Sequence, residues 1–146
     1  HLYLKELQEG IRAPIMDLRQ KVKERMLREE VQKVAVIGTP ATINNGLYRF
    51  DGIGYVELSD HEVEQLSASI FNYNRGENKA VQQRTVENIA RKCLDRGAET
   101  ILLACTEPAV MLKDVNIPKI DTLDVLVEGT IDFYRRMEQH RFLGRE

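Results

Sequence analysis

Short apolar runs alternate with amphipathic stretches along most of the chain, and this alternation predicts the fold class. Four runs rich in β-branched or large aliphatic residues are expected to be strands: 33–38, 54–59, 100–104 and 117–121. Stretches with apolar residues three or four positions apart, or with a turn leading into such a pattern, are expected to contain helices: 19–31, 39–50, 59–74, 79–97, 108–114 and 123–139. Strands that alternate with helices indicate an α/β protein with a parallel sheet covered by helices on both faces.

Local signals mark several of the element ends. Ser59 and Glu62 have the spacing of a capping box at the start of a helix, with Asp60 as a rival cap, and Gly97 suits the residue just beyond a helix end. Pro14 opens the run 13–18, where a strand start tolerates its missing N–H, so a strand is expected there as well.

Composition excludes several classes of function. The 21 basic and 23 acidic residues give a net charge of −2, so no general attraction to nucleic acid is expected. Every apolar run is far shorter than the roughly 20 residues needed to cross a bilayer. Two cysteines do not make a disulfide framework and fit reduced thiols in a cytoplasmic protein, and with three scattered histidines they show no metal-ligand spacing.

Cys105 stands where an apolar strand ends and a helix begins. The strand 100–104 precedes it, and Pro108 suits the first helical turn. Unpaired backbone N–H groups at a helix start favour an anion, so the setting predicts a lowered pKa for this thiol. A buried cysteine that acts as a small apolar residue is the commoner case, and Cys93, on the apolar face of a helix, is interpreted in that way.

The sequence GTPAT at 38–42 follows another apolar strand. Gly38 lets the backbone approach a ligand, and Thr39 and Thr42 place hydroxyls beside the N–H groups of a helix start, which together can bind a carboxylate. An ordinary turn with a helix cap explains the same residues, and no Gly-Lys-Ser/Thr comes after them that would make a phosphate-binding loop. If the two strands are neighbours, both loops face one pocket at the carboxyl edge of the sheet.

Several stretches resemble the aspartate/glutamate/hydantoin racemase superfamily, in its aspartate racemase-like branch. GAETILLACTEPAVML with the later IPKIDTLDVL is similar to the second cysteine motif of that superfamily, and VAVIGTPATINNGLYRF resembles the loop that begins the second lobe. SDHEVEQLSASIFNYNRGE also resembles this branch in position and pattern. Cys-Thr-Glu favours this branch over glutamate racemases, which usually carry Cys-Thr-His.

The resemblance implies two similar α/β lobes, an amino-acid substrate between them and no cofactor. Two cysteines then face each other across the substrate: one removes the α-proton as a thiolate, and the other returns a proton from the opposite side. By motif, Cys105 is one of these thiols, and Thr39, Thr42, Thr106 and Glu107 are substrate-binding candidates. From the residues alone, Thr106 or Glu107 equally fits a helix cap.

One departure from the family pattern concerns the first catalytic cysteine, which normally lies in a Cys-Asn-Thr-x-His motif. The first 18 residues resemble the helix and strand that come after that motif in the family, and His1 matches its last position and is a further site candidate. The resemblance therefore divides the chain into a first-lobe remnant (1–31), a second lobe (32–122) and a C-terminal helix that returns to the first lobe (123–146). We expect a truncated chain, inactive alone, that forms a homodimer or associates with a missing first lobe.

Two other functions fit the same residues. A one-cysteine enzyme of this superfamily, such as a decarboxylase, would use Cys105 alone to protonate an enolate. A non-catalytic binding or assembly module would keep the pocket without the chemistry.

Overall fold

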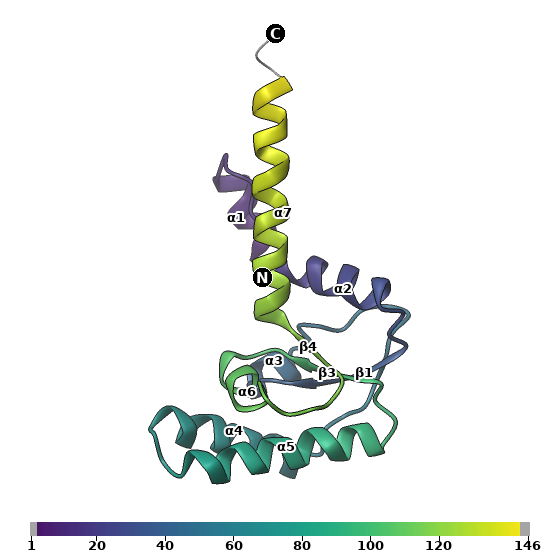
Figure 1. Ribbon diagram of the computed structural model, residues 1–146, viewed down its shortest axis with the longest axis vertical. Helices are drawn as coiled ribbons and strands as arrows, with labels where there is room; N and C mark the ends of the chain where they lie inside the picture. The colour runs from purple at the N-terminus through teal and green to yellow at the C-terminus, as the bar shows by residue number, and fades with distance from the viewer. Residues whose placement is uncertain (1–2, 144–146) are drawn as a thin grey trace.

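A four-stranded parallel sheet forms the centre of the molecule, as the alternation of strands and helices predicts (Figure 1). The computed structural model describes the backbone of residues 3–143 and the side chains of residues 3–139, so His1 lies outside the described residues. The strands lie in the order β2-β1-β3-β4. Their bounds are β1 Lys33–Ile37, β2 Gly54–Tyr55, β3 Thr100–Leu103 and β4 Lys119–Asp121.

Helices cover both faces of this sheet (Figure 1). Their bounds are α1 Leu4–Gly10, α2 Leu18–Arg28, α3 Pro40–Asn44, α4 Asp60–Asn74, α5 Lys79–Asp95, α6 Thr106–Met111 and α7 Thr122–Leu143. On one face Ile37, Ile101 and Leu103 pack with buried residues of α4, α5 and α6. On the other face Val34 and Leu102 pack with buried residues of α2 and the start of α7. The central strands are therefore buried on both sides, as their continuous apolar runs predict.

The helix ends predicted at Ser59 and Gly97 are confirmed. The Ser59 hydroxyl accepts the backbone N–H of Glu62, and the Glu62 carboxylate accepts the backbone N–H of Ser59 at 2.8 Å, which completes the capping box. Gly97 has φ +94° just beyond α5, and the N–H of Ala98 donates to the carbonyl of Cys93 at 3.1 Å. This left-handed turn closes the helix at a position that glycine adopts without steric cost.

The strand predicted at 13–18 is wrong. Residues 11–17 are irregular, and Leu18 begins α2 behind Asp17, whose side chain accepts the N–H of Arg19 at 2.9 Å. The Gln8 side chain occupies the backbone groups that a strand would use: it accepts the N–H of Ile15 at 2.8 Å and donates to the carbonyl of Ala13 at 3.1 Å. A side chain from α1 thus replaces the neighbouring strand that this segment lacks.

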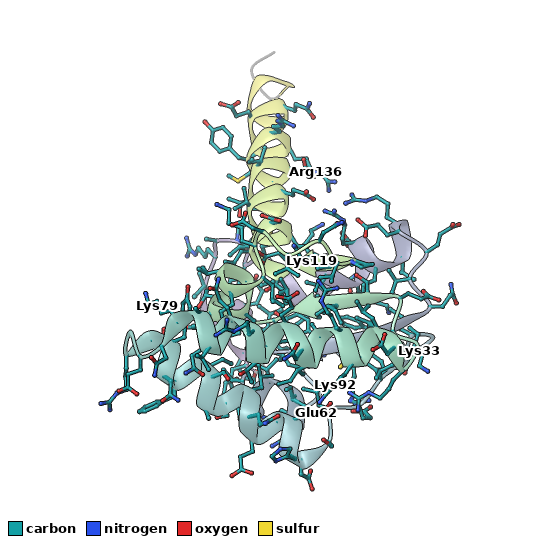
Figure 2. The ribbon with its side chains drawn as sticks, turned by 60° about the horizontal axis from the view of Figure 1, so that its bottom comes forward. Lys33, Glu62, Lys79, Lys92, Lys119 and Arg136 are labelled. Atoms are coloured by element: carbon teal, nitrogen blue, oxygen red, sulfur yellow. The ribbon has the colours of Figure 1, made fainter. Side chains whose placement is uncertain are left out.

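The long helix α7 extends away from the sheet, and Arg136 lies on the extending part (Figures 1 and 2). Its first turns pack on α2. Gly129 in these turns is buried, and a Cβ at this position would lie 2.8 Å from the sulfur of Met16, which precedes α2. Its other face carries large apolar side chains that are exposed: Leu123, Leu126, Val127, Ile131, Tyr134 and Met137. None of the helices in the described part of the chain is both long and apolar enough to span a membrane.

Because the segments 1–31 and 123–139 resemble pieces of a first lobe, we expect them to be mobile or packed against another chain, with apolar faces that have no cover within this chain. That expectation is wrong for α2, because Val22 and Met26 are fully buried against the sheet. It holds for the exposed apolar face of α7 and for α1, where Leu7 is half exposed. The division of the chain into parts of two lobes stays a prediction.

Candidate active site

Thr39 and Cys105 lie just beyond the carboxyl ends of two adjacent strands. β1 and β3 are parallel neighbours whose last paired residues are Ile37 and Leu103, and the N–H of Ala104 continues the ladder to the carbonyl of Ile37 at 2.8 Å. The predicted neighbourhood of the two strands is therefore confirmed. Both loops leave the sheet at the same edge, which is where parallel α/β sheets bind ligands.

The loop after β1 presents two hydroxyls at the start of α3. The side chain of Thr39 accepts the N–H of Thr42 at 3.3 Å and caps the helix, with Pro40 in the first helical position. The two hydroxyl oxygens lie 3.1 Å apart, and both residues are only half-buried. The cap and the hydroxyl pair thus coexist, so that a ligand at this loop would meet two hydroxyl groups together.

The two loops touch each other beside Gly38. A Cβ built on this buried glycine would lie 3.3 Å from the Cβ of Ala104 and 3.4 Å from the Cγ2 of Thr42. The absence of a side chain at Gly38 is thus what lets the loop after β3 approach α3. The Thr39–Thr42 hydroxyl pair and Cys105 thus follow neighbouring strand ends at the carboxyl edge of the sheet.

The loop after β3 gathers three donors on one carboxylate. Oε2 of Glu107 accepts the thiol of Cys105 at 2.8 Å and the hydroxyl of Thr106 at 2.9 Å. Oε1 of the same carboxylate accepts the side-chain amide of Asn74 at 3.0 Å. Cys105 is the N-cap residue of α6, which begins two residues before Pro108 rather than at it. The Cys-Thr-Glu triplet is therefore one hydrogen-bonded cluster.

The pKa of the Cys105 thiol is raised to about 11, so the expected lowering is wrong. Burial of the thiol is the largest cause, and the hydrogen bond to the negative carboxylate of Glu107 is the next. Backbone N–H groups of Glu107 and Thr106 do lower the thiol pKa, as a helix start should, but their effect is smaller. In turn the thiol, followed by the amide of Asn74, lowers the pKa of Glu107 to about 2.

The second cysteine is remote from this chemistry. Cys93 is fully buried in the core between α5 and the sheet, and the guanidinium of Arg96 donates to its sulfur at 3.2 Å. Burial raises the pKa of its thiol. Its interpretation as a core residue is confirmed, and both cysteines are free thiols.

Asn74 is the residue of the cluster that sequence reasoning missed. It is the last residue of α4, just before the loop 75–78 that leads to α5, and only the fold brings it to Glu107. Asp121 also ends a strand at this edge of the sheet, paired in register with Leu103. Its side chain accepts the N–H of Leu123 at 2.8 Å, and burial raises its pKa. Across the described residues, no group of three or more histidine, cysteine or acidic side chains could hold a metal ion.

Three solved structures share this fold. An aspartate racemase homologue from Pyrococcus horikoshii superposes with a TM-score of 0.75 at 25% identity, over 91% of this chain and 62% of that one. A protein from Yersinia pestis described as a candidate Asp/Glu racemase gives 0.78 at 18% identity, over 88% of this chain and 60% of its own. Picrophilus torridus aspartate racemase gives 0.64 at 21% identity, over 82% and 54%.

These matches leave part of each related chain without a counterpart, since this chain spans between 54% and 62% of their lengths. At 18% and 21% identity, two of them show likeness of fold alone. The family model for Asp/Glu/Hydantoin racemase matches residues 1–130, which is most of the sequence. The chain therefore belongs to the Asp/Glu/Hydantoin racemase family.

Proposed function

We propose that this chain carries the second lobe, with flanking segments, of a cofactor-independent amino-acid racemase that acts on an acidic amino acid such as aspartate. The observation that carries the proposal is that a hydroxyl pair and a thiol each follow the carboxyl end of one of two adjacent parallel strands. Thr39 and Thr42 lie 3.1 Å apart after β1, and Cys105 lies just beyond the adjacent parallel strand. Membership of the racemase family and the fold shared with aspartate racemases support it.

Each group has a distinct task in this proposal. The hydroxyls of Thr39 and Thr42 and the N–H groups at the start of α3 bind the substrate α-carboxylate, because they offer several donors to an anion at one point. Thr106 and Glu107, from the loop after β3, contact the same substrate in this proposal. Cys105 exchanges a proton with the α-carbon, which requires its sulfur within about 3 Å of the proton that moves.

Inversion needs a second acid/base group on the far side of the α-carbon. The sequence contains two cysteines, and Cys93 is fully buried in the core, so it cannot reach a substrate at Cys105. We propose that the second group is a thiol from outside this chain, supplied by a first lobe or by a second copy. Alone, the chain binds an acidic amino acid but does not racemise it at an appreciable rate.

Substrate protection of the thiol tests the proposal directly. We expect millimolar aspartate to slow the alkylation of Cys105 by iodoacetamide, and Thr39→Ala together with Thr42→Ala to abolish that protection. Thr85→Ala is a matched control, because this hydroxyl lies on α5 and donates to the carbonyl of Val81. Equal alkylation rates with and without aspartate would overturn the proposal.

The fate of the α-proton tests the need for a second group. L-aspartate incubated with the chain in D₂O is monitored by proton NMR and chiral chromatography. We expect no D-aspartate, and Cys105→Ser serves as the blank. Rapid racemisation that disappears in Cys105→Ser would show that the chain builds a complete site by itself or as a dimer.

A one-cysteine decarboxylase is the second candidate, and the hydrogen bond from the Cys105 thiol to the Glu107 carboxylate favours it. A thiol held neutral beside a carboxylate suits proton delivery to an enolate left by loss of CO₂, since that reaction needs a single acid. In such a reaction the carbon–carboxyl bond breaks, its electron pair forms the enolate, and the thiol proton ends on carbon. Release of CO₂ from a substituted malonate, lost in Cys105→Ser, would favour this candidate over the racemase.

A further inference from the structure

We infer that Asn74 is a positioning residue: its side-chain amide holds the carboxylate of Glu107 against the Cys105 thiol, and so keeps Cys105 in its neutral, proton-donating form. The inference deepens the proposed function, on which it rests for the role of Cys105 in proton transfer and for the acid/base group on the opposite side of the substrate. The hydrogen bonds that join Asn74, Glu107 and Cys105 are observed in the structure and do not depend on the proposed function.

The three donors on Glu107 come from two different places in the chain. Cys105 and Thr106 belong to the same short turn as Glu107 and meet its Oε2 at 2.8 and 2.9 Å. Asn74 comes from the end of α4, 33 residues earlier, and meets Oε1 at 3.0 Å. Because α4 packs on α6, the end of α4 is a fixed point outside the turn. The hydrogen bond from Asn74 thus fixes the Glu107 carboxylate relative to α4.

The hydrogen bond from Asn74 restricts the Glu107 side chain, which lies near the surface where water competes for its oxygens. A glutamate side chain has several rotamers and loses that freedom when it is held in one geometry. The contacts with Cys105 and Thr106 engage one oxygen only, around which the carboxylate can swing. The Asn74 amide engages the second oxygen, so the carboxylate is held at both ends and Oε2 stays directed at the sulfur.

The neutral amide has a further consequence for charge. A lysine or arginine at this position would compensate the carboxylate and reduce its repulsion of a thiolate. Asparagine donates a hydrogen bond without adding a positive charge, so Glu107 keeps its full negative charge beside the sulfur. The proton on Cys105 is therefore retained until a substrate carbanion accepts it. At that step the S–H bond breaks, the C–H bond forms, and the negative charge passes from carbon to sulfur.

This arrangement assigns a resting state to the site. Cys105 begins as the acid, and the group on the opposite side of the substrate begins as the base that takes the α-proton. After one turnover the sulfur carries the charge, and Glu107 then opposes that state. Asn74, acting through Glu107, thus sets which of the two groups holds the proton before the reaction.

The pH dependence of Cys105 alkylation tests the inference without any substrate. The full chain carrying Cys93→Ser, so that one thiol is read, is alkylated with iodoacetamide between pH 6 and 11.5, with Asn74→Leu and Asn74→Ala as the variants. We expect the midpoint of the rate profile to fall by about one pH unit, the low end of the effect of a neighbouring like charge, which raises the rate at pH 8 by roughly tenfold. Asn72→Leu, on the same helix, is the matched control and should leave the midpoint unchanged.

A double-mutant comparison separates positioning from a general structural effect. In a Glu107→Gln background the carboxylate charge is gone, so Asn74→Leu should shift the midpoint no further. An unchanged midpoint in both Asn74 variants would overturn the inference, as would an equal shift in the Glu107→Gln background. Because the readout is the thiol alone, failure of aspartate to protect Cys105 would overturn the proposed function and leave this result standing.

Discussion

Replacing Gly38 with alanine should force apart the ends of β1 and β3, because the added methyl group has too little space. Its Cβ would lie 3.3 Å from the Cβ of Ala104 and 3.4 Å from the Cγ2 of Thr42. The Ala104 methyl is attached directly to the backbone and cannot rotate away. The Thr42 methyl can turn only by changing χ1, which would break the 3.1 Å contact between its hydroxyl and that of Thr39.

The distances give the size of the effect. Carbon atoms in favourable contact lie about 3.5–4.0 Å apart, so the strand ends must separate by a few tenths of an ångström or more. Overpacking of this kind costs about 1–3 kcal/mol, which for a chain of this length lowers Tm by roughly 3–9 °C. Ala104→Gly removes the opposing methyl group and by itself costs about 0.5–1 kcal/mol through added backbone freedom.

Thermal unfolding measured by circular dichroism, with aspartate protection of Cys105 as the functional readout, checks the prediction in both single variants and the double variant. We expect the double variant to be more stable than the sum of the single effects by about 1 kcal/mol, because the two methyl groups no longer meet. Gly10→Ala is the control, since nothing lies within 4 Å of its Cβ position. Strictly additive losses would refute the claim that Gly38 and Ala104 share one space.

Three further predictions concern the reactivity of the two thiols, the loss of folding stability at low pH, and self-association through α7. Iodoacetamide at pH 8 should label Cys105 before Cys93, because Cys93 is fully buried; peptide mapping that found Cys93 labelled first would exclude the site assignment. The depressed pKa of Glu107 stabilises the folded state above the ordinary value of 4.5, and this contribution is lost as the pH falls through about 2. Denaturation at decreasing pH should therefore show a shallower decline in Glu107→Gln, and identical pH profiles would contradict this. Val127 and Ile131 are 56% and 46% exposed on the apolar face of α7, so the purified chain should self-associate in sedimentation velocity and lose this association when both become lysine; a wild-type monomer at high concentration would count against it.

Much of the fold can be predicted from local patterns that the sequence displays directly. The buried strands β1 and β3 correspond to short apolar runs, and the capping box of Ser59 and Glu62 marks the start of α4. These features depend on residues a few positions apart, whose preferences act on the backbone in the same way in any context. The Cys-Thr-Glu triplet likewise identified the candidate site, because its position at a strand end is visible without coordinates.

The tertiary structure decided the features that depend on residues far apart in the chain. Residues 13–18 carry a strand-like pattern, yet the side chain of Gln8 takes up their backbone groups, and no local preference predicts that. The helix start at Cys105 predicts a lowered thiol pKa, whereas burial and the nearby Glu107 carboxylate raise it. Asn74 reaches that carboxylate only because α4 packs on α6. Burial and the position of a charge are properties of the folded surroundings, so the sequence by itself placed Cys105, Thr106 and Glu107 at a strand end, whereas the fold added Asn74 and raised the pKa of the thiol.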